Sequence, residues 1–488
     1  MSLYRTVLGS FKWSVLGELV SKTVGPIVLV VLAKILLPDD FGIVAAATIV
    51  ISFSQVFWDA GLAKTLIQRK HRVAESATVV FWINVVSGTV LFVILLFTAD
   101  PIAQFFDDER IADVIRVLAV QLPLAAACSV HIALEQKDFQ FKRLFWVRVA
   151  TTATPALASI PLAMNGYGYW ALVIGTLLGQ VAQVIVLWAM SSWRPTLWFE
   201  TALAKDLFRF GRWVMLSALL SWFFIWVDAL IVGGFLGIRE LGLYRTGDAF
   251  VTLIFGLLAA PLLPVLYSLF CELAGDMHKL RRTVMLLDRI LMSVILPAGA
   301  GLFVLRDIIP DLIFTAEWQD IGLIIGIIGM TQALSYTVSV KQQVYKAIGR
   351  PEVETQIMVI SMLIRVLFYS VSVQFGLLAF VWARFLSTIV GVINHLVFAN
   401  RIIGIDFRRY FGDLIRVLPA VLIMYFVGRR CQEYLAPNMG VLLQAIILMT
   451  ICSVTYAAIT LVTQRRLVTN AYALLTGKET EVVAHDNG

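Results

Sequence analysis

Two arginines stand inside long apolar segments, where a charged side chain is costly. Arg365 lies about ten residues, or roughly 15 Å of helix, from the nearer end of the segment 353–374. Arg384 lies about eight residues, or roughly 12 Å, from the nearer end of the segment 377–400. A guanidinium stays charged and can hold phosphate or carboxylate groups through two parallel hydrogen bonds. The two arginines are therefore a candidate anion site, and the alternative is that each pairs with an acid or a backbone carbonyl as a structural contact.

Two acidic residues in other apolar segments are candidates for proton uptake. Asp228 lies deep in the segment 213–236, and Asp248 follows Arg245 by three positions in the segment 242–264. Burial favours the protonated form of a carboxyl group, so either acid could take up a proton in a coupled process. The alternative for both is a salt bridge with a neighbouring arginine.

Three further charged residues complete the candidate site. Glu18 and Lys22 are four residues apart in the favourable order for a helical ion pair, so they form either a local pair or one wall of a cavity open to the cytoplasm. Arg116 is a further candidate contact for an anionic substrate, although a cation near the end of a segment can also extend to the lipid headgroups. The same extension explains Arg148 and Lys341.

No pattern in the chain indicates catalysis or a bound metal. The sequence holds no HxxxH, CxxC, Walker-type loop or GxSxG motif, and its four cysteines are expected to be inert thiols. We therefore predict no catalytic residue, no metal, no cofactor and no enzyme activity. The net charge of +7 arises from short basic clusters between apolar runs rather than from one patch, which argues against nucleic acid as a partner.

The composition requires a membrane protein. Of 488 residues, 60% are hydrophobic and only 15% are charged, which is too few polar side chains to cover a soluble globule. Backbone groups in lipid must be satisfied within each segment, so every span is expected to be a helix. The prediction is an all-α polytopic protein with about 14 spans of about 20 residues each. These spans are 13–37, 41–60, 78–99, 111–131, 146–165, 168–190, 213–236, 242–264, 283–305, 321–346, 353–374, 377–400, 414–428 and 439–463.

The basic residues between the spans predict the orientation. With the N-terminus in the cytoplasm, 23 of the 39 Lys and Arg residues fall on the cytoplasmic side and 6 on the opposite side. Such an excess marks the cytoplasmic side of a membrane protein, with both termini cytoplasmic. The predicted parts are an N-lobe, a cytoplasmic linker, a C-lobe, two extra spans and a cytoplasmic tail. They cover residues 1–190, 191–212, 213–400, 401–463 and 464–488, in that order.

Two short motifs recur at an offset of 200 residues. Lys12-Trp13 matches Arg212-Trp213, and Asp40-Phe41-Gly42 matches Glu240-Leu241-Gly242. Each pair brackets one long span and the turn into the next. The repeat predicts two parallel six-helix lobes related by an axis along the membrane normal, with substrate between them near the midplane.

The order of several motifs resembles one family of exporters. They are Ala33-Lys34-Ile35-Leu36-Leu37-Pro38-Asp39-Asp40-Phe41-Gly42, Gly61-Leu62, Leu66-Ile67-Gln68-Arg69, Gln136-Lys137-Asp138-Phe139-Gln140-Phe141-Lys142-Arg143-Leu144, Leu241-Gly242-Leu243-Tyr244 and Ala347-Ile348-Gly349-Arg350-Pro351. Over about the first 400 residues the chain is similar to the Wzx-type lipid-linked oligosaccharide flippases. These form the polysaccharide transporter branch of the multidrug/oligosaccharidyl-lipid/polysaccharide exporter superfamily.

The resemblance implies twelve core helices in two lobes, two extra helices and alternating access. The implied substrate is an undecaprenyl-diphosphate-linked oligosaccharide, moved from the inner to the outer leaflet of the bacterial inner membrane for exopolysaccharide, O-antigen or capsule synthesis. Membrane lipids and a polysaccharide polymerase are the implied partners, and ion coupling is left open. The family has no catalytic signature.

Two alternatives compete with this interpretation. A drug or cation antiporter of the same superfamily should have an acidic cavity, whereas the deepest pair here is basic. A membrane polysaccharide polymerase or glycosyltransferase usually needs a sizeable extracytoplasmic loop, and the longest predicted connection here is 191–212.

Overall fold

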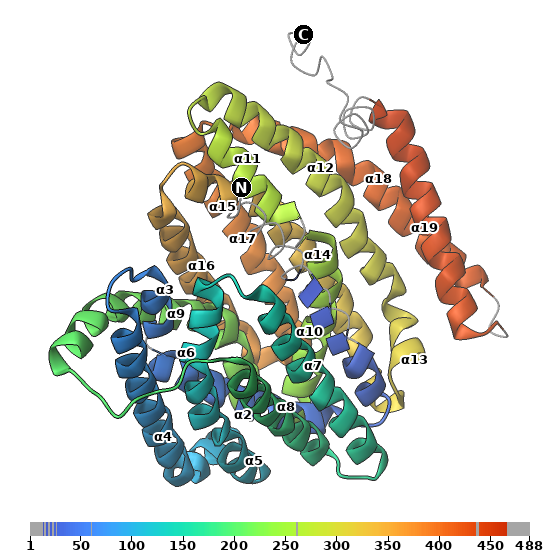
Figure 1. Cartoon of the computed structure of the whole chain (residues 1–488). Coiled ribbons are helices and arrows are strands. Elements are labelled where there is room, and N and C mark those ends of the chain that lie inside the picture. The colour runs from blue at the N-terminus through green and yellow to red at the C-terminus, as the bar shows by residue number, and fades with distance from the viewer. Residues whose placement is uncertain are drawn as a thin grey trace. The chain divides into compact units, whose positions relative to one another are not determined.

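The structure is a computed structural model, and all of its regular structure in the described residues is helical (Figure 1). The described residues are 13, 16–17, 20–21, 24–25, 27–59, 61–259, 262–435 and 439–465. By the density of internal contacts the chain forms two compact units, residues 1–246 and 247–488. The boundary falls within one helix, α10 (Ile238–Ala259).

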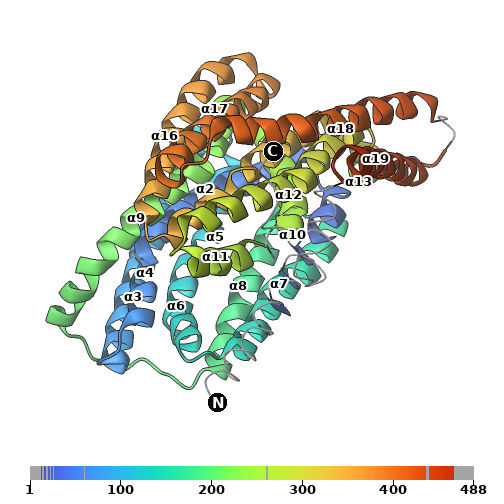
Figure 2. The ribbon, with the colours of Figure 1, turned by 90° about the horizontal axis from the view of Figure 1, so that it is seen from above.

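The first unit contains eight helices before α10 in the part that the structure describes. They are α2 (Pro38–Asp59), α3 (Leu62–Gln68), α4 (Val73–Phe105), α5 (Arg110–Ala119), α6 (Gln121–Lys137), α7 (Phe141–Met164), α8 (Tyr169–Met190) and α9 (Thr201–Phe235). Helices α7 and α8 pack along their lengths and are neighbours in Figures 1 and 2.

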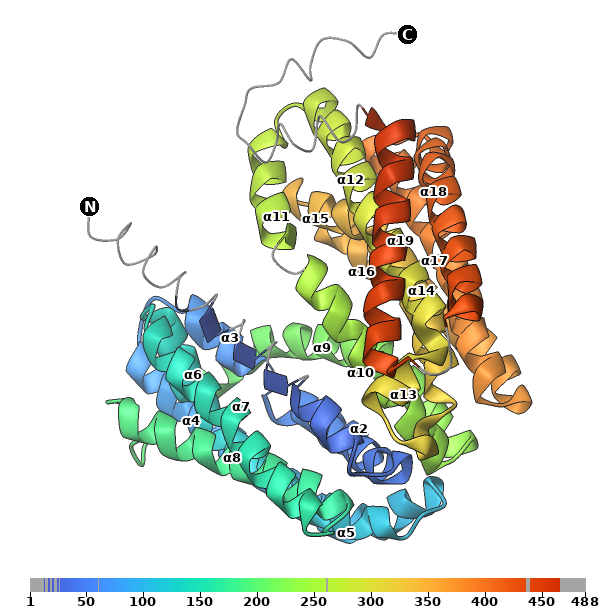
Figure 3. The ribbon, with the colours of Figure 1, turned by 90° about the vertical axis from the view of Figure 1, so that its right-hand side faces the viewer.

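The second unit continues from α10 through nine more α-helices in the described residues. They are α11 (Leu262–Leu273), α12 (Met277–Val304), α13 (Ile309–Ile313), α14 (Ile321–Tyr336), α15 (Ser339–Ala347), α16 (Pro351–Ser372), α17 (Leu377–Ile403), α18 (Phe407–Tyr434) and α19 (Val441–Thr463). Short 3-10 turns lie at Leu305–Asp307, Ala316–Trp318 and Val373–Phe375. Figure 3 shows α18 and α19 side by side as an antiparallel pair.

Twelve helical segments of the described chain are long and apolar enough to cross a membrane, so the chain is a multi-pass membrane protein. They coincide with twelve of the fourteen predicted spans. The predicted span 146–165 is the helix α7, which has the length of a span but falls short of the apolar character of the twelve because it includes Arg148 and three threonines. The predicted span 13–37 lies partly outside the described residues, so the count of fourteen is not confirmed.

The spanning helices are apolar on all sides because they face both protein and lipid. In α4, Val79 and Val80 are buried against other helices, whereas Val90 and Phe97 are exposed on the outside of the bundle. A helix that packs on one face in water would carry polar residues on the other face. The absence of such a polar face in α4 is the pattern expected of a helix that borders hydrocarbon.

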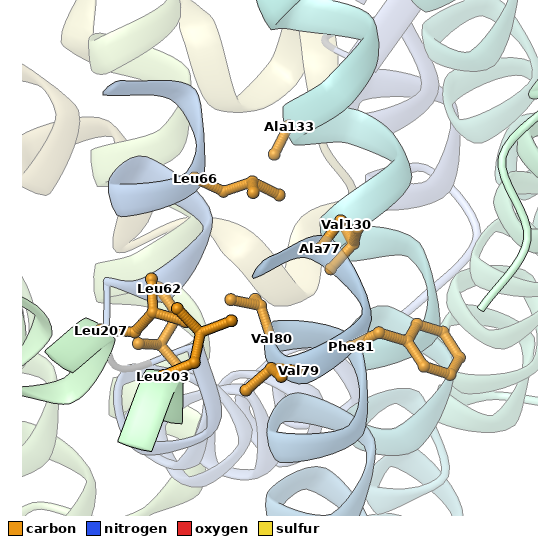
Figure 4. Packing of buried hydrophobic residues seen from close by; sticks show 10 residues of the cluster. All are labelled: Leu62, Leu66, Ala77, Val79, Val80, Phe81, Val130, Ala133, Leu203 and Leu207. Carbon is orange, nitrogen blue, oxygen red and sulfur yellow. The ribbon is translucent and has the colours of Figure 1, made fainter. Parts of the chain in front are cut away.

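The first half of α9 belongs to the core of the first unit rather than to a free linker. Leu203 and Leu207 of α9 are buried with Leu62 of α3 and Val80 of α4 (Figure 4). Burying an aliphatic side chain of this size stabilises a fold by about 1.5–3 kcal/mol. Part of the predicted linker 191–212 is therefore packed against α3 and α4.

A reciprocal contact between α2 and α10 supports the 200-residue repeat. A Cβ on Gly42 would lie 2.0 Å from the carbonyl oxygen of Ile238, and a Cβ on Gly242 would lie 1.9 Å from the carbonyl oxygen of Pro38. Both glycines and both carbonyls are related by the same offset of 200, so the two helices cross by a local two-fold relation. Only glycine allows the backbones to approach this closely.

One predicted span is broken inside the second unit. The sequence 321–346 was expected to form one helix, but α14 ends at Tyr336 and α15 begins at Ser339. Thr337 and Val338 form the turn between them, and both are buried. Irregular backbone at membrane depth is tolerated where protein surrounds it, and in transporters such breaks accompany ion and substrate sites.

Candidate functional site

Two of the predicted site residues bind each other. Arg384 on α17 donates from Nη2 to Oδ1 of Asp248 on α10, at 2.7 Å. The side chains are only 12% and 17% exposed, so the charges are largely shielded from solvent. The candidate anion-binding arginine and the candidate proton-accepting acid therefore form one ion pair in this conformation.

Arg365 lies on α16 at the same height as Arg384. The helices α16 and α17 pack against each other and are joined by the turn 373–376. Arg365 is seven residues before Ser372 and Arg384 is seven residues after Leu377, which places each about 10 Å from the turn. Arg365 is partly buried. The two arginines are thus equally far along their helices from the turn, and their joint role as an anion site stays a prediction.

Asp228 is held by hydrogen bonds inside the first unit. Its side chain on α9 is 7% exposed, and it accepts from the hydroxyl of Tyr244 on α10 at 2.6 Å and from the backbone N–H of Ala229 at 2.7 Å. On the next position of α10, the guanidinium of Arg245 lies 4.3 Å from the ring centre of Trp226. Asp228 is therefore a buried acceptor that links α9 to α10.

Arg116 forms its own ion pairs within the first unit. Arg116 on α5 binds Asp100 at 2.6 Å and Asp113 at 2.8 Å, in an exposed group of charges. Two carboxylates already share its guanidinium, which leaves less positive charge for an anionic substrate. Glu18 and Lys22 lie outside the described residues.

The second unit contains a buried ion pair that the sequence analysis missed. Lys341 on α15 has no solvent exposure, and its ammonium lies 2.5 Å from Oδ2 of Asp288 on α12. The interpretation that Lys341 extends to the headgroups is wrong, because the break after α14 turns the start of α15 into the packed helices. Asp288 lies inside the predicted span 283–305, and an acid at such a position could have indicated a buried basic partner.

A second pair flanks the first one. Arg289, the next residue on α12, lies 2.5 Å from Oδ1 of Asp413 on α18. The hydroxyl of Tyr410, one turn before Asp413, lies 2.7 Å from the hydroxyl of Thr337 at the helix break. The helices α12, α15 and α18 are therefore joined by a continuous group of charged and polar side chains. This group and the Arg384–Asp248 pair are the two sets of buried charges described in the second unit.

An ion pair outside the spans joins the start of α4 to the segment before α9 in the first unit. The guanidinium of Arg72, at the start of α4, binds the carboxylate of Glu200, just before α9, at 2.5 Å. Its hydrogen bonds lower the pKa of the Glu200 carboxyl below its usual range. In addition, the indole N–H of Trp82 donates to the carbonyl of Thr196 at 2.8 Å. The segment 191–200 is thus attached to α4 at two points.

The chemistry available to these groups is charge pairing and anion binding. Within the described residues no group of His, Cys, Asp and Glu side chains is placed to hold a metal ion. Arginines in the membrane can bind an anion if their carboxylate partners exchange for it, and buried carboxylates can bind protons. Both are reversible binding steps.

The fold defines a class of multi-pass helical membrane protein. It matches the solved structure titled lipid II flippase MurJ, inward closed conformation, with a TM-score of 0.76 and 15% sequence identity, over 94% of this chain and 100% of that chain. Residues 31–323 match the family described as polysaccharide biosynthesis protein. The chain belongs to this family, as the motifs in its first 400 residues predict.

Two curated relatives are similar over most of their length. The succinoglycan biosynthesis transport protein ExoT of Rhizobium meliloti (strain 1021) is 23% identical over 469 residues, which cover 95% of this chain and 94% of that protein. The teichuronic acid biosynthesis protein TuaB of Bacillus subtilis (strain 168) is 24% identical over 372 residues, which cover 75% of this chain and 76% of that protein.

Proposed function

We propose that this protein moves undecaprenyl-diphosphate-linked oligosaccharide repeat units from the inner to the outer leaflet for the synthesis of an extracellular polysaccharide. The observation that carries the proposal is the family membership, together with a likeness over nearly the whole chain to ExoT, a protein named for succinoglycan transport. The fold shared with a lipid II flippase adds support, since it is a framework able to carry a lipid-linked saccharide.

The proposal assigns the lipid diphosphate to basic residues in the membrane. Arg365 and Arg384 stand at one depth on adjacent helices, and Arg is suited to bidentate phosphate binding. Arg384 would exchange Asp248 for the diphosphate, so the acid would hold the arginine in place while the site is empty. Lys22 and Arg116 are assigned weaker, long-range attraction for the same group.

The proposal also includes orientation and coupling. Both termini face the cytoplasm of a bacterium and the protein lies in its inner membrane, in accord with the basic residues of the inner connections. Transport proceeds by alternating access and draws on an ion gradient, for which Asp228 and Asp248 are candidate acids. A polysaccharide polymerase receives the unit on the outer side, and the protein itself is not an enzyme.

Deletion of the gene from its native host tests this function. Lipid-linked repeat units should accumulate in the inner leaflet and polymer export should stop, whereas a plasmid copy of the gene should restore both. Accessibility of the sugar to an added lectin in spheroplasts distinguishes the leaflets. The control is a strain that lacks the first glycosyltransferase, which should make no lipid-linked unit at all.

Two outcomes would contradict the proposal. Normal polymer output with increased sensitivity to cationic drugs would favour a drug antiporter of the same fold. Loss of polymer with lipid-linked units already in the outer leaflet would place the protein after the flipping step, as a polymerase or transferase.

A further inference from the structure

The break between α14 and α15 places a buried cation where a carboxylate, a carbonyl and an aromatic ring converge. The ammonium of Lys341 lies 2.5 Å from Oδ2 of Asp288, 3.4 Å from the carbonyl oxygen of Thr337 and 5.0 Å from the ring centre of Tyr410. Oxygen ligands from a broken helix and a carboxylate are the surroundings that membrane transporters provide for a cation. Here the cation is part of the chain.

The pair is not fully satisfied. Asp288 is 4% exposed, and its second carboxylate oxygen, Oδ1, is buried without a hydrogen-bond partner. Most buried polar atoms in proteins have a partner, because a buried carboxylate oxygen that loses its water without replacement raises the free energy of the fold. An unpartnered carboxylate oxygen within the membrane is a place where a proton can bind.

Because other charged groups surround Asp288, its protonation would change the charge balance of the whole group. Arg289 and Asp413 flank the pair from α12 and α18, His395 approaches from α17, and Tyr345 of α15 donates to the carbonyl of His395 at 3.4 Å. In the described state Asp288 and Lys341 cancel each other. When Asp288 is protonated, the ammonium of Lys341 loses its counter-charge and must turn toward another acceptor, such as the carbonyl oxygen of Thr337.

The tethered ammonium also selects the ion. A sodium ion that entered beside Asp288 would meet the positive charge of Lys341 at close range, in a medium that screens charge poorly. A proton can bind Oδ1 on the other side of the carboxylate without displacing the ammonium first. The geometry therefore favours a proton over a metal cation.

We propose that Asp288, paired with Lys341 at the break between α14 and α15, is a proton-binding site of the transport cycle. A proton from the aqueous side forms an O–H bond at Oδ1, the Lys341–Asp288 hydrogen bond breaks, and the angle at Thr337–Val338 becomes free to change. The proposal rests on the proposed transport function for its role, but proton binding itself can be measured without transport.

The direct test is infrared difference spectroscopy of the purified full-length protein in lipid nanodiscs, titrated from neutral to acidic pH. A protonated buried carboxyl group gives a separate carbonyl band, and we expect one band that disappears in Asp288→Asn. The matched control is Asp413→Asn, which removes the neighbouring buried acid and should leave that band. Loss of the band in Asp413→Asn but not in Asp288→Asn would overturn the assignment, as would a wild-type titration with no such band.

Ion selectivity is tested with Lys341→Ala. Without the ammonium, Asp288 and Thr337 face an open position, so sodium should raise the melting temperature of Lys341→Ala relative to the same concentration of choline. The wild type should show no difference between the two salts. Equal sodium stabilisation of both proteins would contradict the exclusion of metal cations. If Lys341→Ala does not fold, Lys341→Gln provides the same comparison.

The role in transport is tested by polymer export in the deletion strain. Asp288→Asn, which cannot exchange a proton, should reduce export per unit of membrane-inserted protein roughly five- to hundredfold, the usual range of a coupling energy. Export is normalised to abundance because Lys341 loses its counter-charge in this variant. The double variant Asp288→Leu with Lys341→Met removes the pair without an unpaired charge. Wild-type export and wild-type sensitivity to a protonophore in that double variant would show that the pair is only structural. If the deletion strain exports polymer normally, the transport function fails while the spectroscopic result still stands.

Discussion

At the residue scale, variants of the Arg384–Asp248 pair can distinguish a role of Arg384 in substrate binding from a role in stability. Arg384→Ala removes a largely buried ion pair with Asp248, which should destabilise the fold by up to about 3–5 kcal/mol and lower membrane abundance. The exchange of Arg384→Asp with Asp248→Arg restores a pair and should restore abundance. If Arg384 binds the lipid diphosphate, the exchanged variant should still fail to export polymer, because the guanidinium then projects from α10.

The measurement compares abundance and export for the single variants and the exchange. Arg384→Lys is the matched control, since it keeps the charge and loses the planar fork, and it should support reduced export. Normal export by the exchanged variant would remove Arg384 from the substrate site and leave the pair as a structural contact.

A second residue-scale prediction concerns acid and the Arg72–Glu200 pair. Arg72 lowers the pKa of the Glu200 carboxyl below the value of 4.5 that an unperturbed glutamate has. The stabilisation is therefore fully present above the unfolded pKa and is lost as the pH falls through the folded pKa. Hydrogen exchange of the first amides of α9, corrected for the intrinsic effect of pH, should accelerate in that acidic window.

Glu200→Gln is the control for this effect. It should show the faster exchange already at neutral pH and no further acceleration in the acidic window. Identical pH profiles for the variant and the wild type would mean that the pair does not hold the start of α9 to α4. The hydrogen bond from Trp82 to Thr196 would then be the effective attachment.

At the element scale, the crossing of α2 and α10 depends on two glycines. Gly42→Ala and Gly242→Ala each place a methyl group about 2 Å from a backbone carbonyl, so the helices must separate, and overpacking of this kind costs about 1–3 kcal/mol. The local two-fold relation predicts similar losses of thermal stability for the two variants. The measurement is the melting temperature of the purified protein.

Gly256 provides the matched control within the same helix. A Cβ at Gly256 meets nothing within 4 Å, so Gly256→Ala should be neutral or stabilising by up to about 1 kcal/mol. If Gly42→Ala and Gly242→Ala behave like Gly256→Ala, the close crossing of α2 and α10 is not a feature of the folded state.

The sequence predicted the spanning elements better than their ends. The segment 414–428 was expected as the shortest span, yet α18 runs from Phe407 to Tyr434. Hydropathy detects only the apolar middle of a helix. Its polar ends continue outside the hydrocarbon, where Asp406 caps the first turn and Arg429 binds Asp307 at 2.5 Å. The break at Thr337–Val338 gave no signal, because it contains neither proline nor glycine and the hydropathy of the span continues across it.

The sequence indicated individual residues of the candidate site but not which of them would contact each other. Arg384 and Asp248 were both selected because a charge within an apolar segment needs a partner. Which partner it has depends on how α10 and α17 pack, and 136 positions separate the two residues in the sequence. Lys341 was misjudged for the same reason, because its distance from the end of a span suggested a surface position while the break in the helix buries it.

At the scale of the whole molecule, the basic residues of the connections predict which side each loop faces. The turns near residues 140, 275 and 405 lie between helices and stand beside basic residues, whereas those near 107 and 315 carry clusters of acids. A single cysteine placed at 140, 275 or 405 should therefore react with a membrane-impermeant maleimide only after the inner membrane is opened. Cysteines at 107 and 315 should react in spheroplasts with an intact membrane.

This labelling needs a background without Cys128, Cys271, Cys431 and Cys452. Two of these, Cys128 and Cys452, are buried, so small replacements such as alanine and serine are preferred and abundance must be checked first. The decisive position is 275, between α11 and α12, because eight of the predicted spans precede it and an even number returns the chain to the side of the N-terminus. Labelling at 275 in intact spheroplasts would require an odd number of crossings before α12. Since α7 is the least apolar of the predicted spans before that point, it would then be the helix that does not cross the membrane. The basic residues of the connections would in that case reflect binding of anionic lipid rather than orientation.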